Sequence, residues 1–249
     1  MAMEANLWLS FLNLLHGIPP LRWFRLALAG WHFNVDAVSL VHDHIWDATS
    51  LVLRRGIRRY ARNGQRVLDM GTGHLGLLAV YCARTNDVNV VAVDVNAKFV
   101  ANARIVAKAS EAPSIDFRQS DWFTKVDGKF DLIFSNCPYV PTEVGFTHYD
   151  LQEHPEIWNG GRDGLDHVQT ILASVDRFLE PQGILLLGID TFYIPRATIV
   201  SLIGESLDLE VRRIIRSWVS SSEVYVIGLK LPVGWFSDWT GSESVVKDH

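Results

Sequence analysis

The stretch RVLDMGTGHLGLLAV, residues 66–80, joins a short apolar run to a helix-like pattern through a glycine-rich turn. The apolar run at 66–70 has strand character, and it is followed by three glycines in the spacing G-x-G-x-x-G, namely Gly71, Gly73 and Gly76. Glycines at this spacing permit a tight turn and let backbone N–H groups approach a ligand at a helix N-terminus. The stretch therefore predicts a strand, a ligand-binding turn and a helix.

Strand-like and helix-like runs alternate around this turn. The predicted strands are 66–70, 89–95, 115–119, 130–136 and 183–189. The predicted helices are 75–84, 97–109, 164–179 and 195–207. This alternation predicts an α/β fold with a mostly parallel sheet covered on both faces. Two further strand-like runs, 209–218 and 223–231, predict an antiparallel C-terminal hairpin at one edge.

Length and composition favour one sizeable domain with small appendages. The chain has 249 residues, of which 48% are hydrophobic and 20% are charged. We expect an N-terminal helical cap at residues 1–50, the α/β domain at 51–231 and a C-terminal tail at 232–249. The oligomeric state has no signal in the sequence.

The net charge and the cysteine content indicate which class of partner and which cellular compartment to expect. The net charge of −5 makes nucleic acid an unlikely partner. Cys82 and Cys137 are too few for a disulfide framework or a thiolate metal site, which indicates a reducing compartment, taken as the cytoplasm. The apolar stretch at 6–18 is too short to span a bilayer and carries a polar stripe, so it predicts a docked helix and no membrane span.

Acidic residues near the glycines predict a nucleotide site. Asp94 ends the second strand, where a carboxylate can accept hydrogen bonds from ribose hydroxyls. Asp69 would be poorly placed beside a pyrophosphate but well placed beside a cationic ammonium, which favours S-adenosylmethionine over a dinucleotide. Asp121 follows the third strand and can accept from an adenine amino group, with Trp122 packing nearby. The alternative is that Asp69 and Asp121 are ordinary turn or cap residues.

The fourth predicted strand runs into FSNCPYV, residues 134–140. Open α/β sheets bind their ligands at the carboxyl ends of the strands, so this loop is predicted to face the reactive end of the cofactor. Asn136, Pro138 and Tyr139 match the motif N-P-P-Y, and here the chain resembles the class I methyltransferases that modify planar nitrogens. Cys137 stands where the first proline of that motif usually is.

The motif predicts how an acceptor nitrogen is held. An NH₂ group whose two hydrogens are both bound aims its lone pair at the incoming methyl carbon. The expected hydrogen acceptors are Asn136 Oδ1 and the backbone carbonyl of Cys137, and the Tyr139 ring is expected to stack on the planar acceptor. Cys137 keeps that carbonyl but lacks the fixed φ of proline, and no base is visible that would activate its thiol as a nucleophile. The expected catalytic residues are Asn136, Cys137, Pro138 and Tyr139.

Two more segments are similar to the HemK/PrmC-type protein glutamine N5-methyltransferases. WNGGRDGLDHVQTIL, residues 158–172, resembles the GG-x-DGL stretch of that family, and residues 26–53 resemble an upstream segment in which Gly30, Phe33, Val35 and Thr49 match. The resemblance implies a seven-stranded Rossmann-like sheet, S-adenosylmethionine as cofactor and a protein glutamine, such as that of a release factor, as acceptor. The expected cofactor-binding residues are Asp69, Gly71, Thr72, Gly73, Asp94, Val95, Ser120, Asp121, Trp122 and Asn136.

The chain departs from the family at HDHIWDAT, residues 42–49, which replaces PRPET, and in a shorter segment before residue 27. Three alternatives therefore stay open. The acceptor is a small amino acid, amine or guanidine; it is an adenine N6 in RNA or DNA, which the acidic net charge disfavours; or the chain is an inactive cofactor-binding subunit.

Three remaining features are interpreted without assigning new chemistry. His42, Asp43, His44 and Asp47 lack a second cluster at ligand spacing, so no metal is expected. The arginines between residues 54 and 62 are interpreted as a solvated helix face rather than an RNA-binding surface. The long loop at 142–158 is a candidate lid or binding loop.

Overall fold

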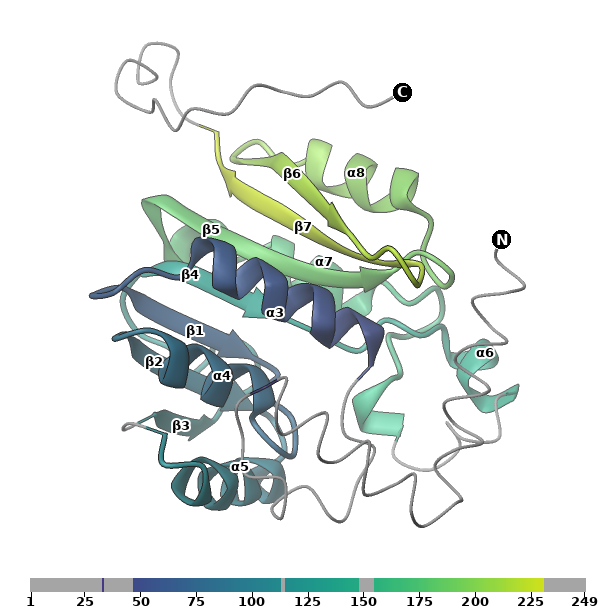
Figure 1. Cartoon of the computed structure of the whole chain (residues 1–249). Coiled ribbons are helices and arrows are strands. Elements are labelled where there is room, and N and C mark those ends of the chain that lie inside the picture. The colour runs from purple at the N-terminus through teal and green to yellow at the C-terminus, as the bar shows by residue number, and fades with distance from the viewer. Residues whose placement is uncertain (1–32, 34–46, 113–114, 148–154, 231–249) are drawn as a thin grey trace.

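The computed structural model describes residues 33, 47–112, 115–147 and 155–230 (Figure 1). Nearly all of the predicted cap at 1–50, and the whole of the predicted tail at 232–249, lie outside these residues, so the division of the chain into three parts stays a prediction.

A seven-stranded sheet with the order β3-β2-β1-β4-β5-β7-β6 forms the centre of the molecule (Figure 1). Its strands are β1 (Arg66–Met70), β2 (Asn89–Asp94), β3 (Asp116–Gln119), β4 (Phe130–Ser135), β5 (Leu179–Asp190), β6 (Leu209–Arg216) and β7 (Ser222–Leu229). The pairings among β1 to β5 are parallel, whereas β7 runs antiparallel to both β5 and β6. The predicted mostly parallel sheet with an antiparallel C-terminal hairpin is confirmed, and β1 and β4 lie side by side within it.

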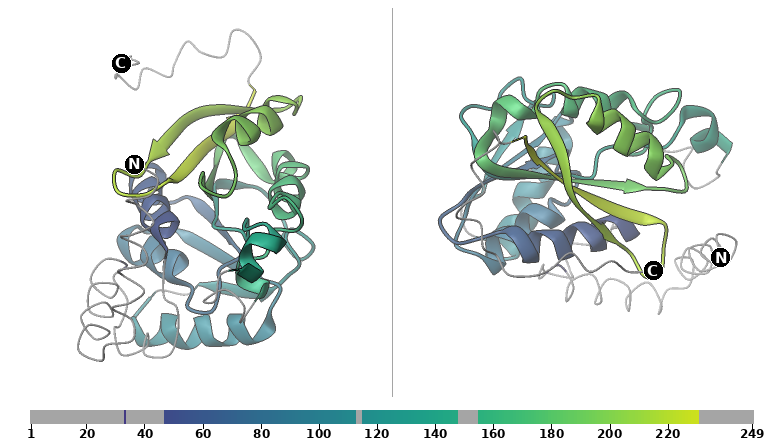
Figure 2. Two further views of the ribbon diagram at one scale, coloured as in Figure 1. Left: turned by 90° about the vertical axis from the view of Figure 1, so that its right-hand side faces the viewer. Right: turned by 90° about the horizontal axis from the view of Figure 1, so that it is seen from above.

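Helices cover both faces of the sheet (Figures 1 and 2). The described α-helices are α3 (Ala48–Tyr60), α4 (Leu77–Thr85), α5 (Ala97–Ala109), α6 (Thr142–Thr147), α7 (Asp166–Leu172) and α8 (Arg196–Gly204). One buried cluster lies between the sheet and α3, α4 and α5, and a second lies between the sheet and α7 and α8. Among the described residues, no helix combines the length and the apolar character that crossing a membrane requires.

The largest difference from prediction is in the segment 164–179, expected to be one helix. The α-helix ends at Leu172, a 3₁₀-helix covers Val175–Phe178, and β5 begins at Leu179 instead of residue 183. Contacts between distant segments explain the difference, because Leu179 pairs with Phe130 of β4 and the ring of Phe178 stacks on that of Phe123 with centroids 4.4 Å apart. A tighter 3₁₀ turn brings the chain into the sheet at that point.

The helix predicted from residue 75 begins later, at Leu77. Gly76 takes a left-handed φ of +58° at the N-cap position, so the turn extends through it before the helix starts. The predicted long loop at 142–158 contains α6 and a 3₁₀-helix at Pro155–Ile157. Each remaining predicted element lies within three residues of its observed bounds at either end.

Two glycines allow α3 to approach the sheet closely. A Cβ added at Gly188 of β5 would lie 2.6 Å from Thr49 Cγ2 and 2.8 Å from Leu53 Cδ1. On the helix side, a Cβ at Gly56 would lie 3.1 Å from Leu186 Cδ1. Because the helix lies directly on β5, its first turn reaches the carboxyl end of that strand.

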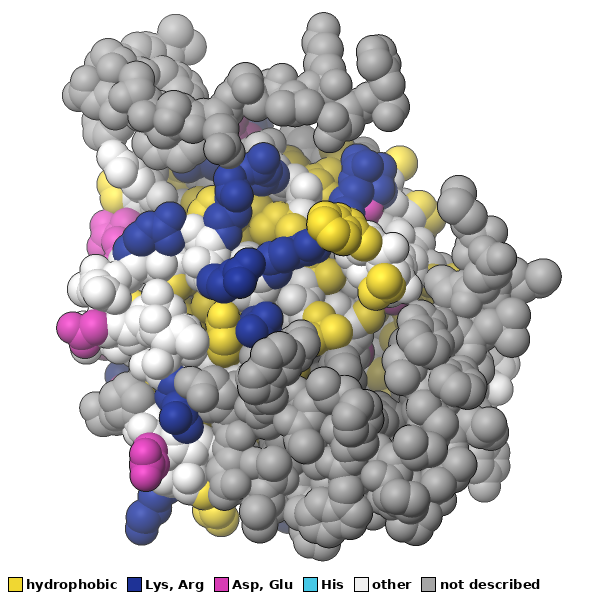
Figure 3. Space-filling view, in the orientation of Figure 1, with side chains coloured by type: hydrophobic (Ala, Val, Ile, Leu, Met, Phe, Trp, Pro, Cys, Tyr) yellow, Lys and Arg dark blue, Asp and Glu magenta, His cyan; other side chains and the backbone are white. Residues whose placement is uncertain are grey.

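The outer face of α3 carries the predicted arginine stripe, and Figure 3 shows Lys and Arg side chains gathered over α3 and the β6–β7 hairpin. The Arg54 guanidinium lies 4.8 Å from the centroid of the Tyr81 ring, and that of Arg55 lies 5.7 Å from the Trp218 ring. Arg58 and Arg59 are exposed. The stripe therefore contributes packing contacts to α4 and to the β6–β7 turn as well as a solvated face.

The close contact at Gly188 generates a stability prediction. Gly188→Ala should lower the free energy of unfolding by about 1–3 kcal/mol, because the added methyl group overpacks the contact with α3. Gly204→Ala is the matched control, since a Cβ there meets nothing within 4 Å and alanine is favoured over glycine in a helix by about 1 kcal/mol. Urea denaturation followed by tryptophan fluorescence measures both. Equal stabilities for the two variants would contradict the packing argument.

Candidate functional site

The glycine-rich turn after β1 presents open space at its surface. Gly71 and Gly73 have φ of +72° and +70°, a region that favours glycine, and a Cβ at either would meet nothing within 4 Å. The backbone N–H groups of Gly71 and Thr72 each donate to Val93 O at 2.9 Å, which ties the turn to β2. The turn is thus hydrogen-bonded to β2 on one side and unobstructed at Gly71 and Gly73, as a nucleotide-binding turn requires.

Asp94 lies at the end of β2 and accepts two backbone hydrogen bonds. Its Oδ2 accepts from Gly73 N and its Oδ1 accepts from Asn96 N, both at 2.9 Å. Burial raises the pKa of this carboxyl, and the backbone donors oppose the shift. A carboxylate has about four acceptor positions, so Asp94 can still accept from two hydroxyl groups. The next residue, Val95, is exposed.

Asp69 is a second, more deeply buried carboxyl at the end of β1. Only 2% of its surface is exposed, and its Oδ2 accepts a hydrogen bond from Thr72 Oγ1 at 2.6 Å. Burial raises its pKa to about 7, with the bond from Thr72 opposing and the negative charge of Asp94 adding to the shift. A buried acid with an acidic neighbour favours a cation beside it.

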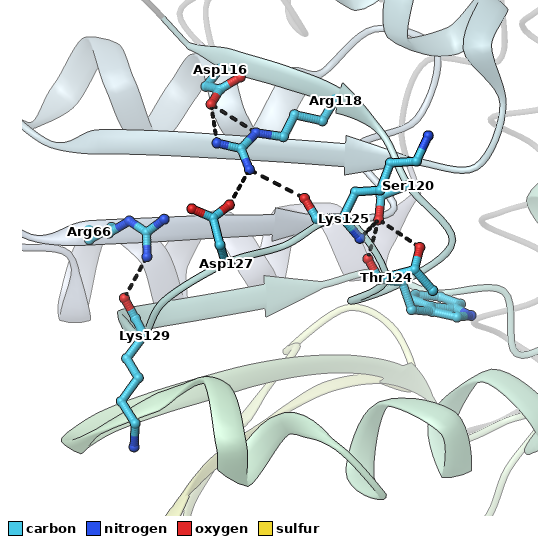
Figure 4. Close-up of polar contacts among 9 residues, drawn as sticks. Arg66, Asp116, Arg118, Ser120, Thr124, Lys125, Asp127 and Lys129 are labelled. Carbon is cyan, nitrogen blue, oxygen red and sulfur yellow. Dashed lines mark hydrogen bonds and ion pairs between the residues drawn. The ribbon is translucent and has the colours of Figure 1, made fainter.

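The turn after β3 is hydrogen-bonded to the end of β2, where Ser120 N donates to Asp94 O at 2.9 Å. Within the turn, the Ser120 hydroxyl donates to Trp122 O at 2.9 Å and accepts from Lys125 N at 3.0 Å (Figure 4). Trp122 has a φ of +44°, an uncommon conformation for a bulky residue that these bonds stabilise. Asp121 is exposed between them. Of the three residues predicted from QSDWF, Ser120 is bonded to Asp94, and Asp121 and Trp122 follow it in the same turn.

Asn136 follows β4, and among the described residues its side chain forms hydrogen bonds only through the Nδ2 group. Its Nδ2 group donates to Asp47 Oδ1 and Oδ2 at 3.2 and 3.3 Å and to Ser50 Oγ at 3.2 Å. Its Oδ1 is buried and has no hydrogen-bond partner within the described part of the chain. Buried polar atoms are nearly always hydrogen-bonded, so this oxygen is a candidate acceptor for a ligand N–H group.

The rest of the NCPY loop is packed into the protein. Cys137 is 1% exposed, and burial raises the pKa of its thiol to about 12, so the thiolate needed for a nucleophile is not favoured. Pro138 is half-buried. Tyr139 is 7% exposed, and burial raises its pKa well above the usual value of a tyrosine. Only a small part of the tyrosine ring is therefore open to stacking.

A chain of hydroxyl groups anchors Tyr139. The Tyr139 and Thr49 hydroxyls are 2.8 Å apart, Thr49 Oγ1 donates to Ser222 Oγ at 3.1 Å, and Ser222 Oγ donates to Asp190 Oδ2 at 3.3 Å. Thr49 and Ser222 are each 1% exposed. This chain joins the NCPY loop to the first turn of α3 and to the paired ends of β5 and β7.

Sequence reasoning missed the role of the first turn of α3. The His and Asp pattern at 42–47 suggests Asp47 only as a possible metal ligand and gives no signal for Ser50. Asp47 is the N-cap of α3, with its Oδ1 accepting from Ser50 N at 2.7 Å, and an acidic residue before an apolar-periodic run is a recognised cap signal. His42, Asp43 and His44 lie outside the described residues, and within those residues no three His, Cys, Asp or Glu side chains are grouped as a metal site requires.

The segment predicted from GG-x-DGL packs behind the NCPY loop. Val140 N donates to Trp158 O at 2.8 Å, and Gly160 N donates back to Val140 O at 2.9 Å. Gly164 has a φ of +83°, and a Cβ there would clash with the backbone carbonyl oxygen of Tyr139. The glycines therefore allow two backbones to lie against each other and brace the loop that carries Asn136.

The sequence and the fold of this chain are both similar to those of known proteins. Residues 39–154 match the family model for the methyltransferase small domain. The chain is 33% identical over 170 residues to the release factor glutamine methyltransferase of Gloeobacter violaceus, an alignment that covers 66% of this chain and 58% of the relative. It is 39% identical over 127 residues to the ribosomal protein uL3 glutamine methyltransferase of Neisseria gonorrhoeae, covering 49% of this chain and 42% of the relative.

The chain spans about half the length of these curated relatives. The predicted resemblance to protein glutamine methyltransferases is confirmed. Among solved structures, a methyltransferase from Pyrococcus furiosus matches with a TM-score of 0.59 at 21% identity, covering 82% of this chain and 92% of that one. The predicted class I methyltransferase fold is confirmed.

The contact between Gly164 and Tyr139 generates a second prediction. Gly164→Ala should lose more stability than Gly64→Ala, although both glycines have nearly the same φ, +83° and +82°. A Cβ at Gly64 meets nothing within 4 Å, so that variant measures backbone strain alone, about 1 kcal/mol. Thermal unfolding of the two variants gives the difference. A Gly164→Ala protein as stable as Gly64→Ala would show that the two backbones are not tightly packed.

Proposed function

We propose that this protein is an S-adenosylmethionine-dependent N-methyltransferase that modifies the side-chain amide of a protein glutamine. The single observation that carries the proposal is the buried, unpartnered Oδ1 of Asn136 at the end of β4. An amide or amino N–H is the natural partner for such an oxygen. This site lies on the strand beside β1, whose glycine-rich turn is the candidate cofactor cradle.

The residues around that turn fit the cofactor. Gly71 and Gly73 leave space for the aminoacyl and ribose parts, and Asp94 has acceptor capacity for ribose hydroxyls. Asp69 is the proposed partner of the ammonium group, since a cation offsets the cost of burying its carboxylate. Asp121 and Trp122 are proposed to contact the adenine. When bound, S-adenosylmethionine supplies an electrophilic methyl group.

The NCPY loop is proposed to orient the acceptor. Asn136 Oδ1 accepts one hydrogen of the substrate NH₂ group, and the backbone carbonyl of Cys137 accepts the other. Holding both hydrogens orients the nitrogen lone pair toward the methyl carbon, which removes much of the entropic cost of reaction. The chain needs no strong base, because water can take the proton once the nitrogen is alkylated. The protonated Cys137 thiol takes no part.

The choice of glutamine rests on the relatives. The two curated relatives described above are named for glutamine methylation, one of a release factor and one of ribosomal protein uL3. A glutamine side chain is a planar primary amide, which matches the acceptor chemistry of Asn136. A substrate protein in the translation apparatus is therefore the proposed partner.

The experiment combines cofactor binding with a methyl-transfer screen. Isothermal titration should show binding of S-adenosylmethionine to the full chain. Radiolabelled methyl groups should then enter the protein fraction of a cell extract, on glutamine, and not the RNA or small-molecule fractions. Label confined to RNA or to small molecules would reject glutamine as acceptor, and absence of binding would reject the proposed cofactor.

Asn136→Ala should abolish most turnover without weakening cofactor binding. Loss of the positioning oxygen should lower kcat by about 100-fold or more, while the Kd for S-adenosylmethionine changes by less than about twofold. Asn63→Ala is the matched control, at an exposed position beside the amino ends of β1 and β2 and therefore away from the carboxyl ends that carry the site, and its turnover should equal that of wild type. Retained turnover in Asn136→Ala would refute the positioning role.

The raised pKa of Asp69 predicts a pH-dependent affinity. An acid whose pKa is raised to about 7 is largely protonated below that pH, and a bound ammonium favours the ionised form. Affinity for S-adenosylmethionine should therefore rise about tenfold per pH unit below pH 7 and level off above it. Titrations between pH 5.5 and 7.5 test this, with Asp69→Asn expected to bind weakly and with little pH dependence. The same weak dependence in wild type would disprove the ammonium contact.

A further inference from the structure

The orientation of the Asn136 amide is decided by groups outside the NCPY loop. Asn136 Nδ2 faces Asp47 Oδ1, Asp47 Oδ2 and Ser50 Oγ at 3.2 to 3.3 Å. We propose that Asp47 is a positioning residue for methyl transfer, whose carboxylate holds the Asn136 amide with Oδ1 presented to the acceptor nitrogen. This inference rests on the proposed function, because it specifies how the same site is held in a reactive state.

The physical reason is that an ionised carboxylate only accepts hydrogen bonds. With the amide as it stands, the NH₂ group of Asn136 lies against both oxygens of Asp47. Rotating the amide by 180° would place Oδ1 against two oxygens of negative charge and would turn the NH₂ group toward the acceptor. An NH₂ group cannot accept the hydrogen of a substrate amide. The flipped state is therefore both repulsive and unproductive.

Asp47 is itself fixed relative to Asn136. As the N-cap of α3 it has extended backbone angles, φ −108° and ψ 175°, and accepts from Ser50 N at 2.7 Å. The next turn position, Thr49, is bonded to Tyr139 at 2.8 Å. The helix start and the NCPY loop are thereby joined on both sides of the Asn136 side chain. This arrangement lowers the entropic cost of holding the amide in one orientation.

Helix capping alone does not account for the contact. A cap needs one oxygen, and the bond from Ser50 N uses Asp47 Oδ1. The other oxygen, Oδ2, lies within 3.3 Å of Asn136 Nδ2 and 3.5 Å of the Tyr139 hydroxyl. The second half of the carboxylate is directed at the NCPY loop.

The test separates capping from positioning. Asp47→Ser keeps a good N-cap residue, but the serine side chain is too short to reach the Asn136 amide. Asp47→Asn keeps one acceptor oxygen. Asp87→Ser is the matched control, with the same substitution at an exposed position that precedes β2. Asp47→Ser should retain its melting temperature and its Kd for S-adenosylmethionine, with kcat lowered by about 100-fold and KM little changed. Asp47→Asn should fall between Asp47→Ser and wild type.

A second readout does not depend on activity. The side-chain NH₂ resonances of Asn136, assigned by their loss in Asn136→Ala, should shift in Asp47→Ser and not in Asp87→Ser. Unshifted resonances together with wild-type turnover in Asp47→Ser would overturn the inference. Should wild type transfer no methyl group to any fraction, the proposed function fails by itself, and the resonances still decide whether Asp47 holds the amide.

Discussion

The hydrogen bond between the Thr49 and Tyr139 hydroxyls, 2.8 Å long and buried, is the interaction on which the candidate site depends. It joins the first turn of a helix to the loop after β4, two segments that are distant in the sequence. Through it, Asp47 and Ser50 come to lie against Asn136. The bond forms because Gly188 lets α3 lie close to β5 and because Ser222 and Asp190 satisfy the remaining hydroxyl donors.

The two halves of the site have different electrostatic character. Around β1 and β2, burial raises the pKa of both Asp69 and Asp94, the charge of Asp94 raises that of Asp69 further, and the pair is suited to a cationic, hydroxyl-rich ligand. At the end of β4, the Asn136 amide lies against the Asp47 carboxylate and the Ser50 hydroxyl, and the thiol of Cys137 is buried and protonated. A cationic ligand and a neutral amide acceptor can thus be held next to each other without a strong base or a nucleophile between them.

Prediction succeeded where a local pattern is sufficient. The glycine spacing at 71–76 and the positions of Asp69 and Asp94 near strand ends are local features of the sequence. These residues lie close together because β1 and β2 pair in parallel, which brings their carboxyl ends to the same edge of the sheet. Prediction failed for the segment 164–179, where helical spacing continues through Val175 and Phe178 although the chain forms a 3₁₀ turn. That choice depends on the pairing of Leu179 with Phe130, about 50 residues earlier in the chain. It also missed Asp47 as a partner of Asn136, because their contact spans 89 positions.

The amino-acid sequence by itself determined the alternation of strands and helices, the glycine turn and the amide-bearing loop, since each depends on backbone preferences and periodicity within a few residues. Only the tertiary structure decided that Nδ2 of Asn136 is hydrogen-bonded while its Oδ1 is left unpartnered, and which side chains surround the amide. The physical reason is that hydrogen-bond partners are selected by proximity, and the approach of α3 to β5 and to the NCPY loop is set by packing between segments that no local pattern connects.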